Sequence, residues 1–148
     1  MKKLVICMLV LLPMLFNVSY GFGLGVMIGE PTGLSAKFWK NERTAIDAGL
    51  AWSFANRYSA IHLHADYLIH NYNLLRLDNT VLPLYYGLGV RVGSAGDDIR
   101  FGVRVPVGID YFFADKKFDV FFEIVPVLDL LPGTGFGING GLGLRYNF

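Results

Sequence analysis

Two histidines and a carboxylate stand at alternate positions in the segment 58–70. In a β-strand, His62, His64 and Asp66 would point to the same face, because successive side chains alternate. A His-x-His pair beside a carboxylate can ligate a metal ion, or can supply the base for hydrolysis of an acyl ester. No serine nearby in the sequence has the geometry of a nucleophile. We therefore favour histidines that are hydrogen-bonded in the interior, and we predict no metal, no cofactor and no catalysis.

A second group of charged residues lies toward the end of the chain. Asp110 stands opposite Asp119 if the chain turns back through residues 114–117, and Asp119 stands opposite Arg145 if it turns back through residues 132–133. Directly opposed residues on antiparallel strands are close neighbours. An isolated charge in a packed interior is costly, so these charges should pair. We predict that Arg145 bridges the two carboxylates.

The same register predicts two further ion pairs. Arg100 should lie near Asp129, and Arg104 should lie close to Glu123 at mid-depth. Such pairs could rearrange and gate a narrow ion path, or they could form a satisfied plug. We favour the plug, because a fully paired polar network makes its surroundings rigid.

The elements that must position these residues are β-strands. Hydrophobic and polar residues alternate with period two in nearly every segment after residue 21, which is the pattern of strands. Segments rich in Gly, Pro, Asn and Asp separate them. Eight strands are predicted, over residues 22–29, 34–39, 45–53, 58–70, 82–93, 99–112, 118–130 and 135–148.

The charges within these strands share one face with the glycines, and the opposite face is apolar and aromatic without interruption. Arg100, Gly102 and Arg104, for example, alternate with Phe101 and Val103. A soluble sheet or a lipocalin-like barrel places its charges outside, and this pattern would leave it with more contiguous apolar surface than is tolerated. In a bilayer the apolar face is required, and a closed barrel leaves no unsatisfied edge. We predict an all-β fold, an eight-stranded antiparallel up-and-down transmembrane β-barrel.

The interior of an eight-stranded barrel is just wide enough for side chains to fill it. The inward glycines should therefore make room for the large inward residues, which are Arg91, Arg104, Arg145 and Tyr85. Pro106 and Pro126 fall inside predicted strands. Because a closed barrel has no edge strand, each proline is expected at a bulge or beyond the hydrogen-bonded span.

The composition agrees with a membrane location. The chain has 148 residues, 53% of them hydrophobic and 17% charged, and a mean hydropathy of +0.44. The longest apolar run covers 13 residues, 4–16. A transmembrane helix needs about 20. The run follows Lys2 and Lys3 and precedes Ser19 and Gly21, which predicts a cleaved signal peptide over residues 1–21 and a barrel over residues 22–148.

Cleavage would remove two lysines and the single cysteine, Cys7. The rest of the chain would then carry 11 Lys and Arg against 12 Asp and Glu, and no disulfide could form. Near-neutral charge gives no support for nucleic-acid binding. One domain is expected from this length.

The last predicted strand has apolar residues at alternate positions up to its end, namely Leu144, Tyr146 and Phe148. This ending resembles the signal that the outer-membrane barrel assembly machinery reads. Aromatic residues near the strand ends are typical of interfacial girdles. The expected partners are therefore outer-membrane lipid and the assembly machinery, and a monomer is favoured.

Several stretches carry a resemblance to a known family, and they are Gly23–Lys37, His62–Asp66, Leu82–Gly87, Val103–Gly108 and Glu123–Asp129. They resemble a family of small, uncharacterised bacterial outer-membrane β-barrel proteins, whose spirochaete members are described as similar to the transmembrane domain of OmpA. The resemblance covers essentially the whole chain after residue 21. It implies a barrel in the outer membrane of a diderm bacterium, but no established activity and no functional residue.

Three functions stay open at this point. We favour a structural or envelope role with a filled polar lumen. A narrow ion-conducting pore gated by lumen salt bridges comes second, and a His-dependent lipid-modifying enzyme comes third. If both barrel ends of the chain are periplasmic, the outward loops 30–33, 53–57, 94–98 and 131–134 are too short for an adhesin or a receptor. The longest connection, 71–80, then falls on the periplasmic side, against the usual trend.

Overall fold

The computed structural model describes residues 21–53, 60–95, 97–131 and 133–148. The predicted signal peptide, except for Gly21, lies outside these residues, and so does most of the predicted outward loop 53–57. Every regular element in the described part is a β-strand. Within it, no helix is long and apolar enough to cross a bilayer.

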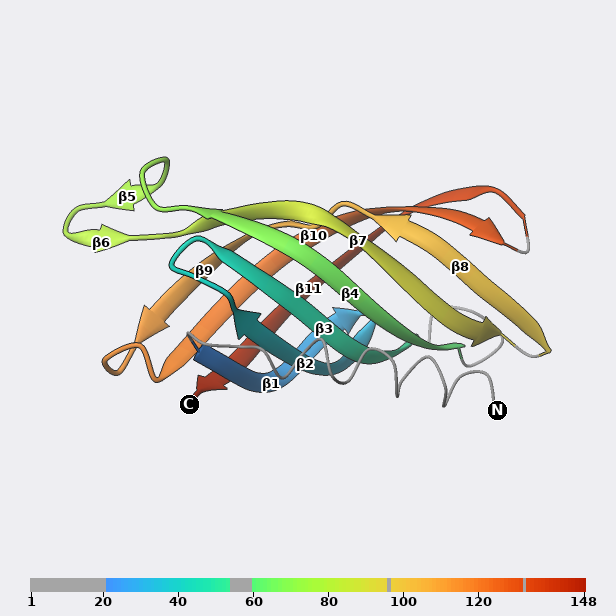
Figure 1. The fold of residues 1–148 in the computed structure, drawn as a ribbon, viewed down its shortest axis with the longest axis horizontal. Coiled ribbons are helices and arrows are strands. Elements are labelled where there is room, and N and C mark those ends of the chain that lie inside the picture. The colour runs from blue at the N-terminus through green and yellow to red at the C-terminus, as the bar shows by residue number, and fades with distance from the viewer. Residues whose placement is uncertain (1–20, 54–59, 96, 132) are drawn as a thin grey trace.

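The described residues form eleven strands. Figure 1 shows that most of them run obliquely across the view. Their bounds are β1 Gly21–Glu30, β2 Thr32–Trp39, β3 Thr44–Ser53, β4 Ala60–Asn71, β5 Arg76–Leu77, β6 Thr80–Val81, β7 Leu84–Ala95, β8 Asp98–Arg104, β9 Val107–Phe113, β10 Phe118–Leu131 and β11 Gly135–Asn147.

Nine of these strands form one antiparallel sheet that closes on itself. Each strand pairs with the next around the sheet, and β11 pairs with both β10 and β1, which completes the circle. The strands β8 and β9 both pair with β7 and with β10, so they are two halves of one interrupted strand. The fold is therefore a closed eight-stranded antiparallel β-barrel, as the alternation predicted.

The interruption between β8 and β9 explains the two prolines. Pro106 lies in the gap between them, and Pro126 lies on β10 opposite that gap, where the ladder lapses between Ile124 and Val127. The carbonyl oxygens of both prolines still accept hydrogen bonds, from Gly87 and Val105 respectively. Both prolines thus lie at positions where the sheet makes no hydrogen bond that would need their missing N–H. This is the kind of interruption that the sequence predicted for them.

The barrel has two ends, which we name by their connections. The proximal end holds the turns 40–43 and 114–117 and the connection 72–83, and the distal end holds the connections after β1, β3, β7 and β10. At the proximal end β5 and β6 form a separate two-stranded hairpin, which projects past the other turns at the upper left of Figure 1. The long connection predicted at 71–80 thus contains a two-stranded hairpin of its own.

The two faces of the barrel wall differ as the parity of the sequence predicted. Large apolar side chains of one parity are exposed on the outside, from Leu24 and Val26 on β1 to Leu142 and Leu144 on β11. The other parity points inward and is buried. Inside, a small apolar cluster is surrounded by charged and polar groups, and it consists of Met27, Leu68, Tyr85 and Phe121.

Candidate functional site

The lumen is filled by charged side chains, and its proximal half is organised around Arg145. This guanidinium lies 3.0 Å from Asp119, with which it is paired in register on β10, and 3.0 Å from Asp110 on β9. It also lies 3.3 Å from Asp47 on β3, and it stacks 4.0 Å from the ring of Phe121. Arg145 itself is fully buried. It bridges three carboxylates where the sequence predicted two.

Asp110 is a partner of Arg145, but the predicted register for it is wrong by two residues. Asp110 stands opposite Phe121 and not opposite Asp119. The turn occupies residues 114–117, as predicted, and it pairs Phe113 with Phe118. Counted from that pair, Asp110 lies opposite Phe121, so the error was in the predicted pairing and not in the turn, whose residues 114–116 adopt the left-handed conformation. The hydrogen bond from Lys117 N to Ala114 O then closes the turn. The shift preserves parity, so Asp110 still points inward.

Lys37 on β2 is the second cation of this half. Its Nζ lies 2.7 Å from Asp110, and it also sits over the rings of Trp39 at 4.7 Å and Tyr85 at 4.8 Å. His70 approaches the same carboxylate at 3.3 Å. Sequence reasoning missed Lys37 and Asp47 as site residues, and it placed His70 on the inward face below Asp66 without predicting its contact with Asp110. The parity test applied to β2 and β3 would have found the lysine and the aspartate, since both lie on the inward parity of short alternating segments.

Arg104 occupies the middle of the lumen. Its Nε lies 2.9 Å from Asp66, and its Nη2 lies 3.6 Å from Glu123. Glu123 also accepts a hydrogen bond of 2.9 Å from the hydroxyl of Tyr85. The predicted neighbours Arg104 and Glu123 thus lie together, but the closest carboxylate to Arg104 is Asp66, which sequence reasoning had placed in the histidine cluster.

The distal half contains one strong ion pair, and its cation differs from the prediction. Arg91 donates to both carboxylate oxygens of Asp129, over 2.6–3.0 Å. The expected pair of Arg100 and Asp129 is wrong, because the two-residue register shift places Gly102, and not Arg100, opposite Asp129. Arg91 and Asp129 keep 13% and 23% of their side-chain surface exposed.

His62 and His64 point into the lumen from β4, beside this distal half. His62 Nε2 and His64 Nδ1 are buried and have no hydrogen-bond partner, and Asp66 forms an ion pair with Arg104. Among the described residues, no group of three or more His, Cys, Asp or Glu is arranged to hold a metal ion. The three residues therefore share a face, as predicted, but do not form a ligand set.

Glycines determine which side chains can meet across the lumen. Asp129, Gly102 and Arg91 stand in one row on three neighbouring strands, so the arginine reaches its partner across a strand that offers no side chain. A Cβ on Gly102 would lie 2.6 Å from the carboxylate of Asp129. Three more contacts have this geometry, and they join Asp66 to Arg104 across Gly89, Glu123 to Tyr85 across Gly108, and Arg145 to Ser35 across Gly25.

Not every inward glycine makes room for a side chain. A Cβ on Gly143 would overlap the ring of Phe121, whereas a Cβ on Gly135 or Gly137 would meet nothing within 4 Å. The latter two lie near the distal tip of β11, beyond Gly140, where its pairing with β1 ends. The expectation that inward glycines accommodate large neighbours therefore holds in the filled part of the lumen and not at its distal rim.

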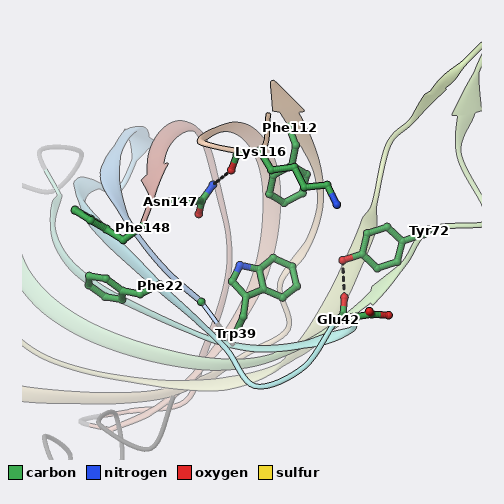
Figure 2. A pocket seen from close by; sticks show the side chains of 9 residues that line it. Phe22, Trp39, Glu42, Tyr72, Phe112, Lys116, Asn147 and Phe148 are labelled. Atoms are coloured by element: carbon green, nitrogen blue, oxygen red, sulfur yellow. Dashed lines mark hydrogen bonds between the residues drawn. The ribbon is translucent and has the colours of Figure 1, made fainter. Parts of the chain in front are cut away.

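The proximal mouth holds an open pocket of about 480 Å³. Figure 2 shows aromatic rings around it, from Phe22 on β1, Trp39 on β2, Phe112 on β9, and Tyr72 and Phe148 just after β4 and β11. Two hydrogen bonds tie its rim together, from Tyr72 to the carbonyl of Glu42 at 2.6 Å and from Asn147 to the carbonyl of Lys116 at 3.2 Å. Its lining residues are Gly21, Phe22, Trp39, Glu42, Tyr72, Phe112, Lys116, Asn147 and Phe148.

Of the three residues of the predicted assembly signal, Leu144 and Tyr146 lie on the outer face of β11, and Phe148 lines the pocket. Leu144, Tyr146 and Phe148 are all exposed, and the ring of Phe148 packs against those of Phe22 and Tyr146 at 5.7 and 4.9 Å. Their role as an assembly signal stays a prediction.

The closed wall and the filled polar lumen define the class as a small eight-stranded β-barrel. The fold is similar to that of the N-terminal β-barrel domain of OprF from Pseudomonas aeruginosa, with a TM-score of 0.62 over 86% of this chain and 97% of that domain. The sequences are 13% identical, so the likeness concerns the fold. No family model matches the chain, and no curated protein does. The likeness agrees with the OmpA-type barrel that the sequence resembled, and membership of the spirochaete family stays a prediction.

Proposed function

We propose that this chain is an integral outer-membrane protein with a structural role in the envelope, and that ion pairs close its lumen. The division of side chains between the two faces of one sheet carries this proposal. Arg104 and Arg145 are buried inside the barrel, whereas Ile28, Leu88 and Phe136 on the outside are 61–73% exposed. An apolar outer face around a polar interior is the arrangement that a bilayer stabilises. The proximal end would face the periplasm.

The membrane location can be tested at one outward position, Leu88. In a bilayer, Leu88→Arg should cost about 2–4 kcal/mol if the site lies near the midplane, and should reduce insertion into lipid vesicles. On the surface of a soluble protein, the same change should cost within about 0.5 kcal/mol. The readout is the gel shift between boiled and unboiled samples after refolding into vesicles, with Leu88→Phe as the matched control. Wild-type samples that ran identically, or an arginine variant that inserted as well as the control, would refute the proposal.

A narrow ion-conducting pore is the second candidate, and the environment of Arg104 favours it. The contact with Glu123 is long, at 3.6 Å, and Arg104 Nη1 is buried without a hydrogen-bond partner. Such a loosely held pair is where a rearrangement would open a path. Planar-bilayer recording separates the candidates. The structural proposal expects no discrete conductance from the wild type. Discrete conductance that Glu123→Gln or Arg104→Ala abolishes would establish the pore.

The third candidate, a His-dependent lipid-modifying enzyme, gains no support from the described residues. His62 and His64 face the lumen and not the outer wall against which a lipid would lie, and Asp66 is ion-paired with Arg104. Mass spectrometry of lipid A with and without the protein tests this candidate. We expect an unchanged lipid profile.

A further inference from the structure

The hairpin at the proximal end is the least expected part of the fold. Periplasmic turns of outer-membrane barrels are usually short, whereas the chain between β4 and β7 runs over residues 72–83 and forms β5 and β6. Leu74 and Leu77 on this hairpin are 62% and 65% exposed, and Leu75 and Val81 are also exposed. A two-stranded hairpin is at best marginally stable alone in water, and this one leaves its apolar side chains uncovered. Its exposed leucines need a partner surface.

The base of the hairpin is fixed to the barrel. Tyr72 donates a hydrogen bond of 2.6 Å to the carbonyl of Glu42 on the neighbouring turn, and Asp110 N donates to the carbonyl of Pro83. Figure 2 shows Tyr72 meeting Glu42 at the edge of the proximal mouth, where the chain leaves the wall. The hairpin is therefore held at a defined place relative to the wall.

One side of the hairpin carries leucines, and the hairpin follows directly on a strand of the apolar outer wall. Tyr67 and Ile69 are exposed on the outer face of β4, and Leu75 and Leu77 come after the bends at residues 72–74. On the returning limb, Leu82 stands across from Leu75, whose carbonyl accepts its N–H at 3.1 Å. This face carries no charge, since Arg76 alternates onto the other one.

We propose that this uncharged face lies on the membrane surface, in the headgroup region of the leaflet at the proximal end, with Leu75 and Leu77 inserted among the lipids. The proposal rests on the proposed membrane location of the barrel. Two observations favour lipid over a protein partner, namely that the hairpin joins β4 and β7, two neighbouring strands of the apolar outer wall, and that this face lacks charged side chains for specific recognition. The barrel would thus contact the membrane surface at a second place, through the hairpin beside its proximal mouth.

A single fluorescent label tests this contact. Because Cys7 is the only cysteine, a Cys7→Ser background allows one labelled cysteine in the full chain. We would place an environment-sensitive dye at Leu77→Cys, with Leu88→Cys as a label on the lipid-facing wall and Lys40→Cys on another exposed turn of the same end. The proteins are refolded into phosphatidylcholine vesicles whose bromine atoms, which quench the dye, lie either near the headgroups or near the chain ends.

The expected result is strong quenching at position 77 by the shallow bromines, less by the deep ones, and little by either at position 40. Adding Leu75→Ser should reduce quenching at position 77, whereas Arg76→Ser on the opposite face should leave it unchanged. If position 88 is quenched and position 77 is not, the proposed contact of the hairpin with the membrane is wrong and the proposal of a membrane barrel stands. Absence of quenching at position 88 would overturn both. Energy transfer between labels at position 77 on different molecules, without lipid quenching, would replace the membrane by a second copy of this chain.

Discussion

The two halves of the lumen hold their charges in different ways. In the proximal half, Arg145 and Lys37 are fully buried; Arg145 contacts three carboxylates, and Lys37 contacts one of the three, Asp110. In the distal half, Arg91 and Asp129 form one bidentate pair that water still reaches. Burial makes the loss of a partner costly for a charge, while water can partly replace the partner of a charge that keeps some exposure, as Arg91 and Asp129 do. The number of ion pairs therefore says less about stability than their depth does.

The buried part of the lumen is also unbalanced. Among the described residues it contains five buried carboxylates, on Asp47, Asp66, Asp110, Asp119 and Glu123, against three cations, on Lys37, Arg104 and Arg145. No cation is spare, so the loss of one cannot be made good by a neighbour. The comparison between the two halves can accordingly be tested one residue at a time.

The largest effect is expected for Arg145→Met. This change leaves Asp47, Asp110 and Asp119 without their shared cation, and should lower the free energy of unfolding by about 3–5 kcal/mol. Urea unfolding of the vesicle-inserted protein measures it. Lys40→Met, on an exposed turn of the same end, is the control and should stay within about 0.5 kcal/mol. A loss below 1 kcal/mol for Arg145→Met would remove the distinction between the halves.

A smaller loss is expected for Gly143→Ala, because its new methyl group would overlap the ring of Phe121, on which Arg145 stacks. Overpacking of this kind costs about 1–3 kcal/mol. The same substitution at Gly137, toward the distal rim, meets nothing within 4 Å and should be neutral. Equal effects at the two glycines in the same unfolding experiment would contradict a tightly filled proximal lumen.

Removal of the distal cation, Arg91→Ala, should cost about 1 kcal/mol or less, since Asp129 is open to water. Salt screens exposed charges more than buried ones. The difference between Arg91→Ala and wild type should therefore shrink as sodium chloride is raised, whereas the difference for Arg145→Met should hardly change. A loss as large as that of Arg145→Met would mean that the distal pair is sealed from water.

The smallest effect is expected for Gly102→Ala. Its methyl group displaces the flexible end of Asp129 and so weakens the pair with Arg91 without removing either charge. The loss should not exceed that of Arg91→Ala. The two substitutions together should cost no more than Arg91→Ala alone, because they remove the same contact. Additive losses in this double-mutant cycle would show that Gly102 does not act through the ion pair.

The inside and the outside of the wall were predictable from the sequence because parity survives any register shift of two residues. The partner of Arg145 on β10, Asp119, was predicted correctly, and the ladder between β10 and β11 runs without interruption from Phe118 to Asp129. The partner of Asp129 was not. The predicted pairing across the 114–117 turn was wrong by two residues although the turn itself lies where it was predicted, and a count from the Phe113–Phe118 pair places Gly102, and not Arg100, opposite Asp129. With a glycine at that position, the cation comes from the strand beyond it.

The longer contacts escaped prediction for a different reason. Register arithmetic pairs neighbouring strands, whereas Arg91 reaches Asp129, and Tyr85 reaches Glu123, across a third strand. Lys37 was overlooked because its strand is short, and a single charge in eight residues is a weak signal. The proximal hairpin was also beyond reach, since two-residue strands leave no alternation to count.

The glycines that lie on the strand between two interacting residues have a consequence for the redesign of such a lumen. A glycine at such a position leaves a gap on the inner face of its strand, and a long side chain on one neighbouring strand can reach through this gap to a partner on the other. Exchanging a glycine with the inward residue two places along its strand would leave the composition and every charge unaltered, yet it would send an arginine to a different carboxylate. The positions of the inward glycines therefore determine which charged residues pair in this lumen. The ion pairs of a small barrel could be redesigned by moving its inward glycines without changing the number of charged residues.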